Sequence, residues 1–531
     1  MDEDRGRRVT AAFSEFFAQP PPGDAAYQIG DPARPGGERT GRPGHVDPGA
    51  AAVTLFHQVA GSVPAYRDFL ARNGTDPAAV RTLSDFQRLP LTTKENYQRR
   101  YPLPQLCRDG RLEGCDMIAV SSGSTGQPAY WPRFLTDELA VAARFEQVFR
   151  DSFAADHQRT LAVVCFPLGT WVGGLYTAAC CRHLAAKGYP ITVVAPGNDA
   201  DEILRVVPGL APEFDQTVLL GYPPFLKAVI DTGRARGLDW SPYGIRLVLA
   251  GEVFSEEWRD LVAERAGMRR PAYDSAALYG TADAGVLGNE TALSVTIRRF
   301  LAARPQAAHA LFGGSRLPTL VQYDPFHRFF EARAGEKPGE KPGEKQGTLL
   351  FSGDSGVPLI RYHIADEGGL VGYDDMLAFC AQYGFDPLAV GLDRGVHQMP
   401  FAYVFGRSHF TVSYFGANIY PENVTVGLEQ PEVSGWVTGK FVLEVLEDAD
   451  RDRYLAVTVE LAPGEPATPE RARLTADAVL AQLRRLNSEF AHYVPEGRQA
   501  PQVRLLPTGD PDYFPPGVKH RYTRGPAQPP R

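Results

Sequence analysis

The sequence predicts an α/β fold in which a large N-terminal domain, with mostly parallel sheets flanked by helices, precedes a small α+β C-terminal domain. The chain has 531 residues, which is more than one hydrophobic core usually serves, so at least two domains are expected. From about residue 117, short apolar runs alternate with helical segments, a rhythm typical of parallel strands covered on both faces. Beyond about residue 405, longer strand-like runs and one polar-faced helical run replace this alternation.

Six short apolar runs are the predicted strands of the large domain. Such runs, bounded by turn residues, are typical of buried strands. They lie at 116–123, 160–169, 191–196, 216–223, 245–252 and 274–280. Because ligands gather at the carboxyl ends of parallel strands, the polar residues that follow three of these runs are expected to share one crevice.

Helical segments precede these strands and lie between them. Residues 136–153 repeat apolar side chains at helical spacing, from Leu139 to Phe149. Residues 53–74 show the same spacing before a glycine stop. The charged repeat at 335–345 has low complexity, and a solvated surface loop is expected there.

Composition and rhythm divide the chain into three parts. Residues 1–50 include a stretch rich in Pro, Gly and Arg and are predicted to form a poorly ordered N-terminal arm. Residues 51–405 are the predicted large domain, and residues 406–531 the small one. The predicted elements of the small domain are two antiparallel strands and one helix, at 440–448, 452–462 and 468–490.

Composition also excludes several classes of protein. The net charge of −8 argues against a nucleic-acid binder, which needs a basic face to displace counterions from phosphates. No run approaches 18 apolar residues and the N-terminus lacks a signal-peptide pattern, so no membrane contact and a soluble, cytoplasmic protein are expected. The six cysteines include no C-x-x-C pair, which favours reduced structural thiols over disulfides or a zinc site.

The first candidate site is the loop SSGSTGQP at 121–128, predicted to connect a strand to a helix. Glycines allow the backbone to approach a polyphosphate, amides and hydroxyls donate to its oxygens, and a following helix N-terminus adds a favourable dipole. The loop is not a Walker A motif, because it lacks the G-K-[ST] ending. An ordinary Ser/Gly turn is the alternative.

The second candidate site is AALYGTAD at 276–283. Tyr279 can stack on a base while Asp283 holds Mg²⁺; a core tyrosine beside a capping aspartate is the alternative. The third is IRYHIAD at 360–366, where Asp366 can accept hydrogen bonds from both hydroxyls of a ribose. A turn-forming aspartate is the alternative at that position.

The order of these motifs resembles the motif series of the acyl-adenylate-forming (ANL) superfamily. The series runs SSGSTGQP, LAGE at 249–252, YGTAD at 279–283, IRYHIAD, Phe405-Gly406-Arg407 and a late Lys519. LPLTTK at 89–94 and GANIYP at 416–421 resemble the phenylacetate–CoA ligase branch. The resemblance covers roughly residues 60–525, nearly the whole chain.

The resemblance implies a role for each matching residue. The large domain is then the adenylation core with the ATP and acyl sites, and the small domain is mobile and carries the catalytic Lys519, with Lys440 as an alternative cation. Asp283 ligates Mg²⁺, Asp366 binds the ribose, and His409 occupies the hinge between the domains. The implied ATP-binding residues are Ser122, Gly123, Ser124, Thr125, Gly126, Gly251, Glu252, Tyr279, Gly280, Thr281, Asp366 and Arg407.

The chain departs from the family pattern at three places, one of which is His409 at the hinge, where relatives have Asp or Lys. Ala129 stands where members outside this branch carry a lysine, so the loop itself neutralises less phosphate charge. Ala282-Asp283 stands where relatives usually have Ser or Thr followed by Glu. The shorter carboxylate can still ligate Mg²⁺, which often takes only one or two carboxylates.

The acid is specified only by the predicted acyl pocket. Its expected lining residues are Phe166, Trp171, Gly174, Tyr176 and Tyr222. An aromatic lining favours a flat aromatic acid, because stacking adds to the burial of apolar area. Ordinary core aromatics are the alternative for each of these residues.

Three functions fit the sequence. The first is ATP-dependent activation of an aromatic carboxylic acid to acyl-AMP, with release of pyrophosphate and transfer of the acyl group to CoA. The second is a stand-alone adenylation enzyme of an antibiotic or other secondary-metabolite pathway, which passes the acyl group to a carrier protein, an amine or an alcohol. The third is a catalytically silent nucleotide- or acyl-binding homologue. The implied cofactors are ATP, Mg²⁺ and, for the first function, CoA; a homodimer remains open.

Overall fold

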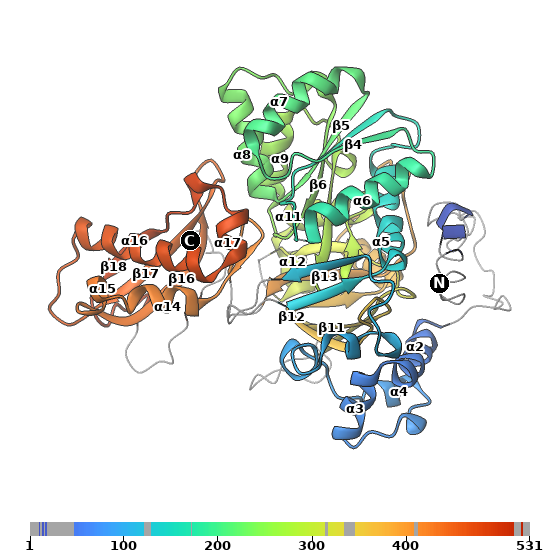
Figure 1. Cartoon of the computed structure of the whole chain (residues 1–531). Coiled ribbons are helices and arrows are strands. Elements are labelled where there is room, and N and C mark those ends of the chain that lie inside the picture. The colour runs from blue at the N-terminus through green and yellow to red at the C-terminus, as the bar shows by residue number, and fades with distance from the viewer. Residues whose placement is uncertain are drawn as a thin grey trace.

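The computed structural model describes residues 10, 13–14, 16–18, 47–121, 129–170, 172–313, 317–333, 346–407, 412–514 and 522–523. Figure 1 shows a large α/β part, which ends with the strand at Arg407, and a smaller lobe beside it. The small lobe begins at Val412. Within the described ranges, no helix has the length and apolar character that a bilayer span requires.

One large sheet organises the large part. Among the described residues it has eleven strands in the order β10-β11-β12-β13-β9-β8-β7-β6-β5-β3-β4. Their bounds are β3 Thr160–Val164, β4 Ile191–Val194, β5 Gln216–Gly221, β6 Ile245–Ala250, β7 Ser275–Thr281, β8 Gly285–Asn289, β9 Thr319–Gln322, β10 Phe329–Arg333, β11 Gln346–Gly353, β12 Leu359–Val371 and β13 Phe401–Arg407.

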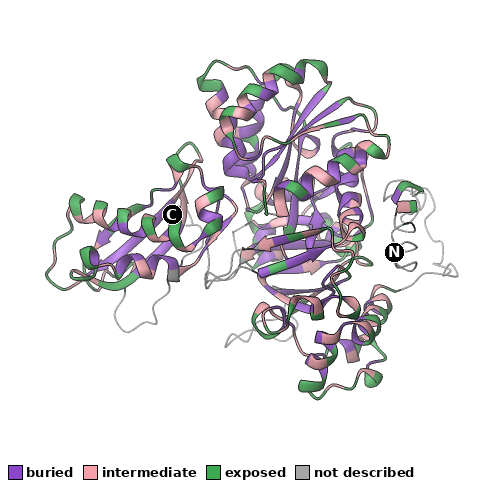
Figure 2. Cartoon of the chain, in the orientation of Figure 1, coloured by how far each residue is buried: buried purple, intermediate pink, exposed green. Residues whose placement is uncertain are grey.

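Five strands at one end of this sheet are parallel, namely β4, β3, β5, β6 and β7. They match five of the six predicted runs, and β3 and β5 are buried along their whole length (Figure 2). Continuous burial follows from helices on both faces, which is why these strands are mostly apolar. The flanking helices are α5 Leu135–Gln147, α6 Val172–Ala186, α7 Ala200–Leu210, α8 Pro223–Ala235, α9 Glu256–Ala266 and α10 Pro271–Asp274.

The α/β fold with a large sheet is therefore confirmed, but the sheet is mixed rather than mostly parallel. Strands β8 to β13 pair antiparallel with their neighbours. These strands carry charged residues among the apolar ones, such as Arg361 and Asp366 in β12, so they did not show as apolar runs. Three further helices, α11 Ala292–Ala302, α12 Pro305–Phe312 and α13 Tyr373–Gln382, accompany this half of the chain.

The sixth predicted run forms a hairpin outside the large sheet. Strands β1 (Met117–Ser121) and β2 (Ala129–Arg133) pair antiparallel with each other, and Ser121 faces Ala129 at the end of the hairpin. The loop at 122–128 therefore connects two strands, and the prediction of a helix directly after it is wrong, since α5 begins only at Leu135. The dipole of a following helix cannot contribute to binding at this loop.

The N-terminal helices agree with the predicted helical segment, with one difference. Pro64 divides the segment into α2 (Pro48–Ser62) and α3 (Pro64–Arg72), because proline is favoured at the first turn of a helix and not inside one. A short α4 (Leu83–Phe86) follows. Helix α2 begins within the predicted arm, at Pro48, where Asp47 caps it. Most of the arm and the whole of the 335–345 repeat lie outside the described residues.

The small lobe is an α+β unit, as predicted. Strands β16 (Val437–Glu447) and β17 (Arg453–Leu461) are antiparallel, and β18 (Gln502–Leu506) joins β17 in parallel. A second sheet consists of the hairpin β14 (Val412–Tyr414) and β15 (Ala417–Ile419). The helices of the lobe are α14 Pro421–Leu428, α15 Pro431–Ser434, α16 Pro469–Leu486 and α17 Ser488–Tyr493.

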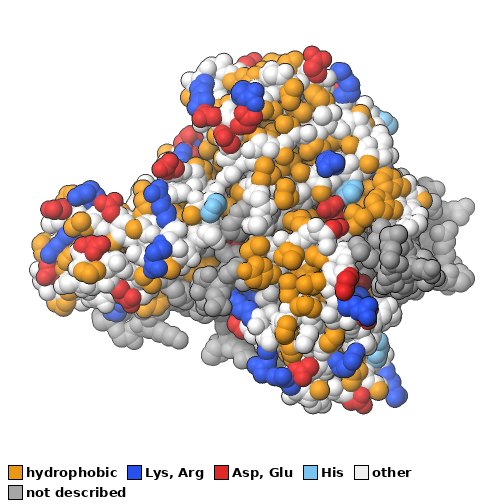
Figure 3. Space-filling model, in the orientation of Figure 1, with side chains coloured by type: hydrophobic (Ala, Val, Ile, Leu, Met, Phe, Trp, Pro, Cys, Tyr) orange, Lys and Arg blue, Asp and Glu red, His pale blue; other side chains and the backbone are white. Residues whose placement is uncertain are grey.

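The face of the molecule seen in Figure 3 shows no extended patch of charge of a single sign among the described residues. Acidic and basic side chains are interspersed there, and apolar side chains gather near its centre. Ile118 of β1 and Tyr130 of β2 are among the exposed apolar residues, at 42% and 47% of their full exposure.

Candidate active site

Two motifs that lie far apart in the sequence meet through a pair of tyrosine–aspartate hydrogen bonds. The Tyr279 hydroxyl of β7 donates to Oδ2 of Asp366 in β12, at 2.8 Å. The Tyr362 hydroxyl of β12 donates to Oδ2 of Asp283, directly after β7, at 2.7 Å. All four side chains are buried, and each motif supplies one donor and one acceptor. The structure thus brings the second and third candidate sites together as one site.

The Asp283 carboxylate also lies beside a cation. Lys94 Nζ is 3.4 Å from Asp283 Oδ1, and the two side chains are 18% and 5% exposed. The LPLTTK segment reaches this place because Thr92 Oγ1 donates to Ile360 O at 2.8 Å and bridges to β12. From the sequence, Lys94 was only the last residue of the LPLTTK motif, with no role of its own. The absence of a lysine at Ala129 is the sequence signal that could have directed attention to a cation in another motif.

The backbone around Asp283 is held by two arginines. Arg133 of β2 donates to the carbonyl oxygens of Ala282 and, at 3.5 Å, Asp283. Arg328 donates to the carbonyl of Ala284 at 3.2 Å. Three consecutive carbonyls are therefore bound by guanidinium groups, which restrains the direction of the Asp283 side chain. Because Arg133 ends the β1–β2 hairpin opposite Met117, it also ties the base of that hairpin to the Asp283 segment.

The site has donors and acceptors suited to a nucleotide with a divalent cation. Asp283 is an oxygen ligand of the kind that Mg²⁺ prefers, and its present partners are a hydroxyl and an ammonium group. The Tyr279 ring stacks on Phe330, with 6.3 Å between the ring centroids. Thr281 Oγ1 accepts from the amide of Ala284 at 3.2 Å, so this hydroxyl belongs to the same turn.

Gly251 and Glu252 face the small lobe in this structure. Glu252 Oε1 accepts from the amide of Gly416 at 2.6 Å, and its other oxygen pairs with Arg453. Burial raises the pKa of the Glu252 carboxyl, while the Arg453 guanidinium opposes that rise. Ser413 Oγ donates to Gly251 O at 3.3 Å. This segment therefore forms a contact between the two parts of the chain.

The predicted acyl-pocket residues fall into two groups. Phe166 and Tyr222 lie edge to face with ring centroids 5.0 Å apart, and Tyr222 stacks on Tyr493 of the small lobe at 5.5 Å. Tyr176 is buried on α6, and a Cβ at Gly285 would lie 3.8 Å from its ring. Tyr176 therefore lies close to the Asp283 segment. Gly174 packs tightly, since a Cβ there would lie 2.2 Å from the carbonyl oxygen of Pro167.

Several predicted site residues lie outside the described residues. They are Ser122, Gly123, Ser124, Thr125, Gly126, Trp171, His409 and Lys519. Arg407 is described only by its backbone, which pairs with Asp366 across β12 and β13. Gly280 lies in β7, between Tyr279 and Thr281.

Comparison with known proteins gives three findings. No family model matches the chain. A phenylacetate–coenzyme A ligase of Aromatoleum evansii is 23% identical over 410 residues, covering 76% of this chain and 78% of that protein. A phenylacetate–coenzyme A ligase of Thermus thermophilus is 26% identical over 378 residues, covering 70% and 72%. These similarities confirm the resemblance that the motifs indicated.

Solved structures agree on the fold. A 2-hydroxyisobutyryl-CoA ligase, crystallised with its adenylate and CoA, matches 90% of this chain and 89% of its own with a TM-score of 0.60 at 15% identity. The same ligase in its postadenylation state matches with a TM-score of 0.51 at 13% identity. The α/β fold of a large part followed by a smaller C-terminal lobe is therefore confirmed.

Proposed function

We propose that this chain, an adenylate-forming ligase similar to phenylacetate–CoA ligases, activates an aromatic carboxylic acid with ATP and then transfers the acyl group to CoA. The observation that carries the proposal is the meeting of Tyr279, Asp283, Tyr362 and Asp366 at one place. The four residues come from two motifs that the sequence assigned separately to a base, a metal ion and a ribose. The division into a core at 51–405 and a mobile domain at 406–531 is part of the proposal.

The nucleoside would bind at Tyr279 and Asp366. A carboxylate is an acceptor-only group, so Asp366 can take both hydroxyls of a ribose, and Tyr279 offers its ring to the adenine. In the structure one Asp366 oxygen accepts from the Tyr279 hydroxyl at 2.8 Å. That bond holds the carboxylate in place before the nucleotide arrives.

The polyphosphate would lie between Asp283, Lys94 and the loop at 122–128. Mg²⁺ bound by Asp283 would supply positive charge to the phosphate oxygens. Lys94, 3.4 Å from Asp283, supplies an ammonium group at the same place, which compensates for Ala129. Arg133 and Arg328 keep the Asp283 turn in position while these charges change partners.

The first half-reaction joins two anions. A carboxylate oxygen of the acid attacks the α-phosphorus of ATP, the new O–P bond forms, and the bond to the pyrophosphate oxygen breaks in line with it. Because both reactants are negative, fixed cations must offset their repulsion and the charge that develops on pyrophosphate. Lys94 and, by the family resemblance, Lys519 are the cations proposed for this role.

The second half-reaction transfers the acyl group. The CoA sulfur attacks the carbonyl carbon of the acyl adenylate, the thiol proton is released, and AMP leaves with the electrons of the C–O bond. The buried aromatic residues Phe166, Tyr176 and Tyr222 of the predicted acyl pocket favour an aromatic acyl group.

Pyrophosphate exchange against a panel of aromatic and aliphatic acids tests the proposal. Exchange with at least one aromatic acid is expected, and mass spectrometry should detect its CoA thioester when CoA is added. Adenylation without a thioester would replace CoA by another acceptor, such as an amine, an alcohol or a carrier protein. The absence of exchange with every acid would leave a silent nucleotide- or acyl-binding protein.

A further inference from the structure

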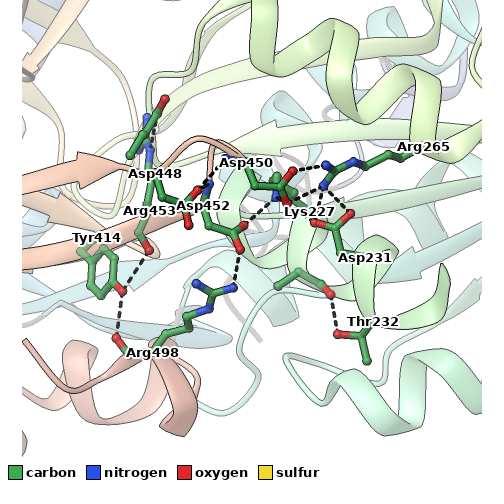
Figure 4. A network of polar contacts seen from close by, with 12 residues as sticks. Lys227, Asp231, Thr232, Arg265, Tyr414, Asp448, Asp450, Asp452, Arg453 and Arg498 are labelled. Atoms are coloured by element: carbon green, nitrogen blue, oxygen red, sulfur yellow. Dashed lines mark hydrogen bonds and ion pairs between the residues drawn. The ribbon is translucent and has the colours of Figure 1, made fainter. Parts of the chain in front are cut away.

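The small lobe is held against the large part by ion pairs centred on one turn, residues 448–453 between β16 and β17 (Figure 4). Lys227 of α8 is 2.6 Å from Asp452 Oδ1 and 3.4 Å from Asp450 Oδ2, and its side chain is 1% exposed. Arg265 of α9 binds Asp450 from the other side, with Nη1 at 3.1 Å from Oδ2. Two cations of the large part therefore enclose two carboxylates of the turn.

A second ion pair crosses the same boundary in the opposite sense. Arg453, at the end of the turn, pairs with Glu252 and donates to the carbonyl of Val253. The Glu252 side chain is fully buried, while Arg453 is 16% exposed. The cation now belongs to the lobe and the carboxylate to the large part. The turn can thus dock only where both complementary groups face it.

Most of the charged groups at this boundary also have a partner on their own side. The large part supplies Lys227, Arg265, Asp231 and Glu252, which are two cations and two carboxylates. The lobe supplies Glu447, Asp450, Asp452, Arg453 and Arg498, which are three carboxylates and two cations. When the lobe leaves, Lys227 and Arg265 keep Asp231, and Asp452 keeps Arg498. Separation therefore removes the ion-pair partners of Glu252 and of Asp450, which is already 57% exposed, while Arg453 keeps Glu447.

We propose that the 448–453 turn is a reversible ionic latch that holds the small lobe in one of two working orientations. Buried aromatic contacts, such as Tyr222 on Tyr493, add affinity, but the charges determine the register of docking. Pairs that water can replace are suited to a boundary that opens in every catalytic cycle. The second working orientation and the kinetic part of the test below rest on the proposed function, whereas the docking of the lobe by these ion pairs does not.

The orientation of the lobe can be measured without any substrate. Nitroxide labels at Arg205→Cys on α7 and Arg485→Cys on α16 report the distance between the two parts, since both positions are exposed. Cys115→Ser removes the one native cysteine that is not buried. The latch predicts one dominant distance at low salt and a growing second population as salt rises, because screening weakens partly exposed pairs.

Three variants then separate the latch from general effects. Arg453→Gln should lower the docked-to-undocked ratio by roughly tenfold, because it leaves Glu252 buried without its cation. Asp450→Asn should lower the ratio by roughly threefold, since that carboxylate is already 57% exposed. Asp477→Asn, on an exposed ion pair inside the lobe, is the matched control and should leave the ratio unchanged.

Two outcomes would overturn the latch. One is an unchanged distance distribution in both Arg453→Gln and Asp450→Asn, when circular dichroism shows that they are folded. The other is an equal shift in Asp477→Asn. If Arg453→Gln does not fold, Asp450→Asn alone decides.

The kinetic arm follows the two half-reactions. In Asp450→Asn one half-reaction, pyrophosphate exchange or transfer from a prepared acyl adenylate, should slow while the other stays constant or accelerates. Equal slowing of both would contradict a latch that selects between orientations. If the wild-type chain exchanges no pyrophosphate, the proposed function fails, yet the distance measurement still decides the latch.

Discussion

The hydroxyl of Tyr279 donates a hydrogen bond to Asp366, a residue 87 positions later in the chain, with 2.8 Å between the oxygens. The reverse arrangement joins Tyr362 to Asp283 at 2.7 Å. Two aspartates that the sequence assigned to different parts of a nucleotide are thus positioned by tyrosines from each other's motif. A substitution in one motif should therefore alter the position of the aspartate in the other.

Asp366→Asn should weaken ATP binding and leave stability nearly unchanged. The asparagine oxygen can still accept from Tyr279, but the charge-assisted bonds to the ribose, worth about 1.5–3 kcal/mol each, are lost. We expect the apparent ATP affinity to fall about tenfold or more. Titration with ATP and the melting temperature together check this. Asp374→Asn, at an exposed position of α13, is the control. An equal loss of ATP affinity in that variant would contradict the assignment of Asp366 to the ribose.

Asp283→Asn should cripple adenylation even at saturating ATP, and added Mg²⁺ should recover part of the rate. The reason is that an amide oxygen is a weaker ligand for a hard cation than a carboxylate. Pyrophosphate exchange measured over a range of Mg²⁺ concentrations gives the result. Exchange at the wild-type rate, with the wild-type Mg²⁺ dependence, would reduce Asp283 to an acceptor for Tyr362.

Lys94→Met should lower the rate of exchange by about 10²–10³, the usual loss when one donor to developing charge is removed. Lys440→Met is the matched control, because that lysine is 48% exposed and pairs with Glu460 inside the lobe. If Lys440→Met caused the larger loss instead, the catalytic cation would have to be reassigned to Lys440.

Arg133→Gln should reduce both stability and adenylation. Its guanidinium is almost fully buried and binds the carbonyls of Ala282 and Asp283, so a shorter amide leaves buried acceptors unpaired at a cost of about 1–3 kcal/mol each. Arg133→Lys retains the charge and should recover part of the stability. Urea unfolding and pyrophosphate exchange on both variants check this expectation. Full activity in Arg133→Gln would mean that the Asp283 turn needs no such support.

Lys519→Ala, a prediction from the sequence because the residue lies outside the described ranges, should separate the two half-reactions. Exchange should fall by about 10²–10³, since the ammonium faces charge that develops during adenylation. Transfer from a chemically prepared acyl adenylate should continue at close to the normal rate. Equal losses in both assays would show that Lys519 supports the folding or docking of the lobe.

The parallel half of the sheet could be predicted because its strands are buried on both faces. The run 161–166, most of which lies in β3, is then apolar without interruption and stands out in the sequence. Strand β12 could not be recognised in this way. It carries Arg361, His363 and Asp366, and its polar residues are explained by contacts to other segments rather than by any local period.

The sequence identified single residues of the candidate site but not the long-range contacts that join them. Tyr279, Asp283 and Asp366 belong to motifs that can be read locally. Lys94 reaches Asp283 only through the bridge from Thr92 to β12, a contact between residues 268 positions apart. Arg133 acts on backbone carbonyls, and no side-chain pattern marks a residue with that task.

The β1–β2 hairpin has a consequence for how this protein can vary. Within the part of the chain that the structure describes, its two strands pair with each other and not with the eleven-stranded sheet, and Arg133 ties its base to the Asp283 turn. Insertions or deletions between Ser121 and Ala129 would therefore leave the pairing of the main sheet intact. A library of variants with altered lengths in that stretch should therefore keep the stability of the main sheet. The variants should differ from one another in adenylation rate.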